Sequence, residues 1–98
     1  MVKWIPAENG GTIGQLGTEN GVILKDEEWP HTGRITLEED REKASITCGL
    51  YGTFFHTAYT SVENGSQLYA RMKAALEDSP DDLEPLMDWC AWFVHEFQ

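Results

Sequence analysis

Apolar residues in the middle of the chain recur at every second position, which is the spacing of a β-strand with one buried face. Residues 34–38 and 44–50 both follow this alternation. Residues 54–59 are rich in aromatic and β-branched side chains, which favour strands. The pattern therefore predicts three strands, the first two with one face in solvent.

Turn signals divide the N-terminal part into further short segments. Asn20-Gly21 accepts the positive φ angles of a tight hairpin turn, so residues 12–16 and 22–26 are predicted to form a hairpin. Residues 2–5 are predicted to add an edge strand that Pro6 ends.

Beyond residue 60 the spacing of apolar residues changes to about 3.6, which indicates helices. Thr60 and Glu63 have the spacing of a capping box, so a first helix is expected from there to about Asp78. Gly65 lies on its apolar face, which predicts a close approach to the sheet.

A second helix is predicted with Ser79 as its cap and Pro80 at its first position. One stripe of this helix is expected to face the core: Leu83, Leu86, Met87, Cys90, Phe93, Val94 and Phe97. The order of elements predicts one α+β domain over residues 1–98. It consists of an antiparallel β-meander of about five strands, followed by two C-terminal helices packed on one face.

Two tryptophans of the second helix lie away from that stripe. Trp92 is nearly opposite to it, and Trp89 lies between, on a secondary face with Pro85 and Glu96. Either other parts of the chain cover these rings, or a partner does. Because tryptophan is enriched in interface hot spots, the pattern predicts a homodimer whose interface is Pro85, Trp89, Trp92 and Glu96.

Charge narrows the class of partner. Seventeen acidic and seven basic residues give a net charge of −10, and the basic residues form no cluster. Nucleic acid and anionic membranes are therefore not expected as partners, whereas a basic protein would suit an inhibitor or adaptor of this charge. The sequence shows no secretory signal and no apolar run of membrane-spanning length, so a cytoplasmic location is expected.

No motif in the sequence identifies a reaction. Cys48 and His56 could act as nucleophile and base, but Cys48 alternates in phase with buried residues, where a thiol is usually inert. The spacings of Cys and His fit no metal site, and no cofactor is expected. An alternative function is a small-molecule binder or enzyme with a pocket between sheet and helices, lined by Phe54, Phe55, His56, Tyr59 and Tyr69.

Overall fold

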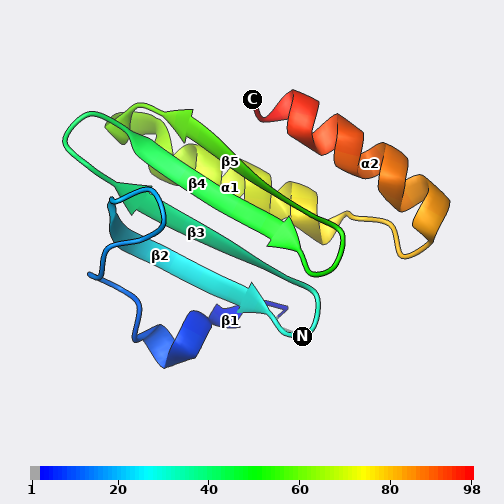
Figure 1. The fold of residues 1–98 in the computed structure, drawn as a ribbon, viewed down its shortest axis with the longest axis horizontal. Coiled ribbons are helices and arrows are strands. Elements are labelled where there is room, and N and C mark those ends of the chain that lie inside the picture. The colour runs from blue at the N-terminus through cyan, green and yellow to red at the C-terminus, as the bar shows by residue number, and fades with distance from the viewer. Residues whose placement is uncertain (1–2) are drawn as a thin grey trace.

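Five antiparallel strands in sequence order form one sheet, and two helices follow them (Figure 1). The computed structural model describes residues 3–98. Its elements are β1 (Ile5–Pro6), the 3-10 turn η1 (Ala7–Gly10), β2 (Val22–Trp29), β3 (Gly33–Glu39), β4 (Ala44–Leu50), β5 (Phe54–Thr60), the 3-10 turn η2 (Val62–Asn64), α1 (Gly65–Glu77) and α2 (Leu83–Glu96). The predicted α+β meander followed by two C-terminal helices is confirmed.

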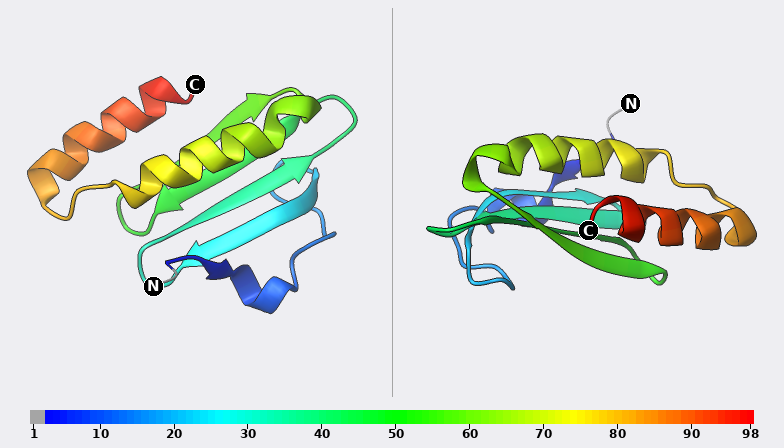
Figure 2. Two further views of the ribbon diagram at one scale, coloured as in Figure 1. Left: turned by 180° about the vertical axis from the view of Figure 1, so that it is seen from behind. Right: turned by 90° about the horizontal axis from the view of Figure 1, so that it is seen from above.

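The core forms where α1 lies across β3 and β4 (Figure 2). Ile35 pairs with Cys48 and Leu37 with Ile46 across the two strands, and all four side chains are buried. Helix α1 covers them with Tyr69, Met72 and Leu76, which are buried in turn. The alternation predicted for residues 34–38 and 44–50 is therefore confirmed for the apolar residues that face α1, whereas Glu38 and Ser45 of the face predicted in solvent are buried as well.

Gly65 stands where α1 comes closest to the sheet. A Cβ atom at this position would lie 2.8 Å from the Cβ of Ala44 and 3.4 Å from Cδ1 of Leu37. Gly65 is the first residue of α1, and the close approach that the sequence predicts explains its presence there.

Residues 11–21 do not form the strand expected at 12–16. They fold back onto β2 through one isolated bridge between Leu16 and Val22 and through a hydrogen bond from the Gly14 N–H to the Ile23 carbonyl. Asn20 does adopt a positive φ of 63°, as the turn prediction requires. The outer edge of β2 is instead paired by β1, with Ile5 opposite Glu28; Val2 of the predicted edge strand lies outside the described residues.

Helix α2 begins at Leu83, three residues later than Pro80, where the sequence places its start. Asp82 precedes the helix with extended backbone angles, and its side chain makes no cap hydrogen bond. The late start places Pro85 in the first turn, where a missing N–H breaks no helical hydrogen bond. A start at Pro80 would place Pro85 in the interior of the helix, where proline costs about 3 kcal/mol.

Helix α2 lies beside β5, farther from the centre of the sheet than α1 (Figures 1 and 2). Phe93 and Phe97 are buried, and Leu86 and Trp89 pack against the core. The prediction that the stripe as a whole faces the core is wrong for Leu83, Met87 and Val94, which are exposed. The reason is that a helix at the edge of a sheet contacts the core along only one narrow side.

We expect Gly65→Ala to destabilise the protein by about 1 kcal/mol, because overpacking costs about 1–3 kcal/mol and outweighs the gain in helix propensity. The midpoint of urea unfolding measures this change. Ser66→Ala, at the exposed neighbouring position, should leave the midpoint unchanged or raise it. A Gly65→Ala variant more stable than the wild type would show that α1 is free to move away from Ala44.

Candidate functional site

Helix α2 exposes a line of apolar side chains to solvent. The exposed fraction is 72% for Leu83, 60% for Met87 and 37% for Val94, and Cys90 on the same line is partly exposed. We call these four residues the α2 seam. Their spacing of four, three and four residues is that of the contact positions in paired helices.

The two tryptophans of α2 differ in their surroundings. The ring of Trp89 packs against Phe54 and Phe93, at centroid distances of 5.9 and 5.1 Å. Trp92 lies 6.1 Å from Trp89 and 6.2 Å from Phe97, and is 47% exposed. The other two residues of the sequence-predicted interface, Pro85 and Glu96, are exposed. Of the two rings, Trp92 therefore offers more free surface to a partner.

The five residues of the sequence-predicted pocket do not come together. Phe54 and His56 face the helices, where Phe93 contacts both. Tyr69 is a buried residue of α1, and its hydroxyl donates a hydrogen bond to Oε1 of Glu27 at 2.6 Å. Because neighbours along a strand point to opposite faces, Phe55 and Tyr59 of β5 lie on the other side of the sheet.

Cys48 and His56 are direct neighbours across β4 and β5, as the sequence allows. Burial raises the pKa of the Cys48 thiol to about 12, so the thiol stays protonated at neutral pH. The Nε2–H of His56 donates to the main-chain carbonyl of Phe97, with the two heavy atoms 2.6 Å apart. This pair therefore presents neither a thiolate nor a free base at Nε2, and it fits a structural role that fixes the end of α2.

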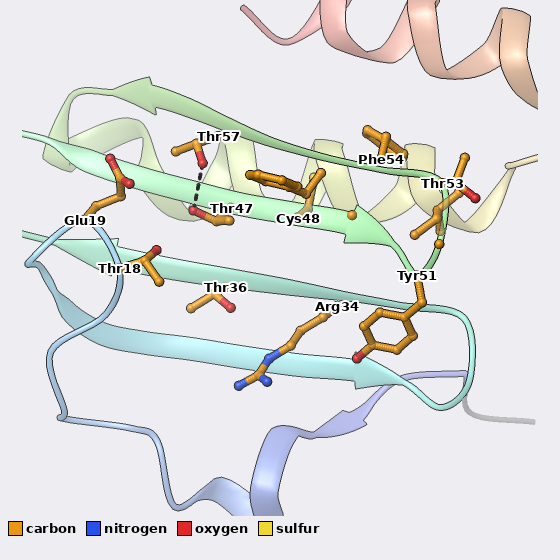
Figure 3. Close-up of a pocket in the computed structure, with 14 residues that line it drawn as sticks. Thr18, Glu19, Arg34, Thr36, Thr47, Cys48, Tyr51, Thr53, Phe54 and Thr57 are labelled. Carbon is orange, nitrogen blue, oxygen red and sulfur yellow. Dashed lines mark hydrogen bonds between the residues drawn. The ribbon is translucent and has the colours of Figure 1, made fainter.

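The sheet face opposite the helices, which we call the open face, carries a groove of about 660 Å³ (Figure 3). Three threonines from three neighbouring strands form its floor: Thr36, Thr47 and Thr57 are paired in one row across β3, β4 and β5. The hydroxyls of Thr47 and Thr57 are 3.1 Å apart and hydrogen bonded. Strand alternation predicts that these side chains face away from the core, but it does not predict a groove.

Asp26 extends the threonine row onto β2 and is the most heavily hydrogen-bonded acid of this face. Arg34 donates to both carboxylate oxygens, at 3.0 and 2.7 Å, and Thr12 and Thr36 donate one hydrogen bond each. Burial alone would raise the pKa of Asp26, but these donors outweigh it and lower the pKa below its usual range. The same contact with Asp26 raises the pKa of Arg34, which keeps the guanidinium charged.

Glu38 anchors the segment 11–21 beside the groove. Its side chain is buried, and Oε1 accepts hydrogen bonds from the backbone N–H groups of Glu19 and Gly21, at 3.1 and 3.2 Å. Gly17 packs so closely on this carboxylate that a Cβ atom would lie 2.2 Å from its carbon. The carboxylate thus fixes the loop that brings Thr18 and Glu19 to the groove.

Comparison with families of known proteins, with curated proteins and with solved structures finds no match. Between residues 3 and 98 there is no helix long and apolar enough to cross a membrane. The same residues contain no cluster of three or more His, Cys, Asp or Glu side chains arranged to hold a metal ion. The inference of function therefore rests on the α2 seam and the open face.

We expect Asp26→Asn to destabilise the protein at pH 6 by about 1–3 kcal/mol, because Arg34 and the threonines lose an ionised acceptor. A lowered pKa stabilises the fold above the unfolded-state value of 3.8, and this contribution is lost as the pH falls through the folded-state pKa. The difference from the wild type should therefore shrink at pH 2.5. Urea unfolding at both pH values measures it.

Asp81→Asn, at an exposed position before α2, serves as the control and should change the unfolding free energy little at either pH. An equal loss of stability for Asp26→Asn at pH 6 and pH 2.5 would contradict a role of the ionised carboxylate.

Proposed function

We propose that this chain is a protein-interaction domain that pairs with a second copy of itself through the α2 seam. The observation that carries the proposal is the exposure of Leu83, Met87 and Val94 along one line of a helix that has its own core contacts on another side. A helix with two apolar sides exceeds what a single small core can cover.

The spacing of the seam fits an antiparallel pair of α2 helices related by a two-fold axis. In that arrangement Leu83 of one copy lies opposite Val94 of the other, and Met87 lies opposite Cys90. Opposed helix dipoles favour the antiparallel orientation.

The expected affinity is modest. Full burial of a Leu, Met or Val side chain gains about 1.5–3 kcal/mol, so the partly exposed residues of two seams gain roughly 5–10 kcal/mol in all. Association costs about 4–15 kcal/mol in lost freedom of motion. The balance supports a dimer with a dissociation constant in the micromolar range or weaker, unlike a permanent assembly.

Trp92 offers a second surface, on the side of α2 that the sequence predicts as the interface. Its ring is already in contact with Trp89 and Phe97 of its own chain, so a partner would gain less from it than from the seam. A cytoplasmic setting belongs to the proposal, because Cys48 and Cys90 are both free thiols, and reducing compartments keep thiols free.

We expect the wild-type chain to pass from monomer to dimer as its concentration rises from about 10 µM to about 1 mM, as the affinity estimate implies. Met87→Glu should remain monomeric over this range, because each dimer would bury two unpaired carboxylates. Sedimentation equilibrium measures the average mass at each concentration.

Gln67→Glu adds the same charge at an exposed position of α1 and should leave dimerisation unchanged. Trp92→Glu tests the tryptophan surface of α2 separately from the seam. A dimer that survives Met87→Glu and is lost in Trp92→Glu would replace the seam with the tryptophan surface, and a wild-type monomer at every concentration would end the proposal.

A further inference from the structure

The open face and its surroundings carry more acids than cations. On the helix side, four cations lie over aromatic rings, with distances of 4.9–5.8 Å to the ring centroids: Lys3, Lys25, Arg71 and Lys73. On and around the open face stand five acids: Glu8, Glu19, Asp26, Glu28 and Glu38. The cations near them are Arg34, which Asp26 neutralises, and Lys43, which is paired with Asp40. The open face therefore presents negative charge.

Two of these acids are held at the rim of the open face by tyrosines. The hydroxyl of Tyr51 donates to Oε2 of Glu28 at 2.7 Å, and that of Tyr59 donates to Oε1 of Glu19 at 2.6 Å. A carboxylate that accepts one hydrogen bond keeps free lone pairs for a cation. Both carboxylates are thus oriented and still able to bind a positive group.

An exposed apolar ring stands in the same strand row as Glu28. Phe55 is 82% exposed, which is the highest value among the exposed large hydrophobic residues, and it stands beside the threonine row. In the sheet it is separated from Arg34 only by Gly49, whose lack of a side chain leaves the ring open on that side. An exposed phenylalanine next to threonine methyl groups offers a contact for one apolar side chain.

We infer that the open face binds an extended segment of a basic partner protein. The row that contains Glu28 and Phe55 and the row that contains Tyr59 are four residues apart, which corresponds to about 13 Å along the strands. Glu28 is on β2 and Tyr59 on β5, three strands apart, which adds about 14 Å across the sheet. An extended segment with Lys or Arg at positions i and i+4 spans the distance along the strands, and its long basic side chains reach outward across the sheet to the two acids. Its residue i+2 points to the same side and lies over the threonine row, two residues along the strands from Phe55, and the threonine hydroxyls can bond its backbone.

This inference goes beyond self-association and uses a different surface. The groove is formed by β3, β4, β5 and the segment 11–21, whereas the seam lies on α2. The two can therefore be tested separately. Binding is measured both on the wild-type chain and on Met87→Glu, so that a failure of dimerisation leaves the result for the open face intact.

The probe is a seven-residue peptide with capped ends, lysine at positions two and six, leucine at position four and serine elsewhere. We expect it to shift the backbone amide resonances of Thr36, Thr47 and Thr57 in NMR titrations and to bind more weakly as salt is added. A peptide with the two lysines side by side should bind at least about threefold more weakly, because it reaches one carboxylate at a time.

Glu19→Gln and Glu28→Gln should each weaken binding about three- to fivefold, and Phe55→Ser by a similar factor. Glu63→Gln, an equal loss of charge at an exposed position in η2, should have no effect. The inference is overturned if millimolar peptide leaves the open-face resonances unshifted. It is equally overturned if Glu63→Gln weakens binding as much as the rim variants do, or if both lysine spacings bind alike.

Discussion

The contact of α1 with β3 and β4 is the interaction on which the rest of the structure depends. It buries Ile35, Leu37, Ile46 and Met72 almost completely, and Gly65 allows the helix to come that close. A chain of 98 residues has enough apolar side chains for one such core. Because α1 occupies the middle of one sheet face, α2 is left with the edge, and the other face has to be made compatible with water.

The open face is compatible with water because hydrogen bonds between its own residues satisfy its polar groups. Asp26 is buried yet ionised, because Arg34, Thr12 and Thr36 saturate its carboxylate. Glu38 is buried for a different reason, since it anchors the segment 11–21 through two backbone N–H groups. The polar network therefore fixes the shape of the groove, and the side chains left exposed around it, such as Phe55, do not contribute to that network.

What the sequence predicts well is determined by neighbours along the chain. The alternation at residues 34–38 and 44–50 follows from strand geometry alone, and the close approach at Gly65 is visible because glycine is otherwise unfavourable in a helix. The orientation of α2 depends instead on where the helix docks, so Trp89 turns inward and Met87 outward, against the sequence prediction. The groove is likewise unpredictable, because it needs both the twist of the sheet and the placement of Glu19 by Glu38.

The two surfaces proposed for function have a common origin. A single helix can cover only part of a five-stranded sheet. In this fold the second helix therefore contacts the core along only one narrow side, and one face of the sheet has no helix on it. In most small domains polar side chains would fill both places. In this chain Met87 and Leu83 are exposed on α2, and Phe55 is exposed on the open face. None of these three side chains adds to the core. The exposed apolar side chains of α2 are the basis for the proposed contact with a second copy, and Phe55 is the basis for the proposed contact with a basic segment.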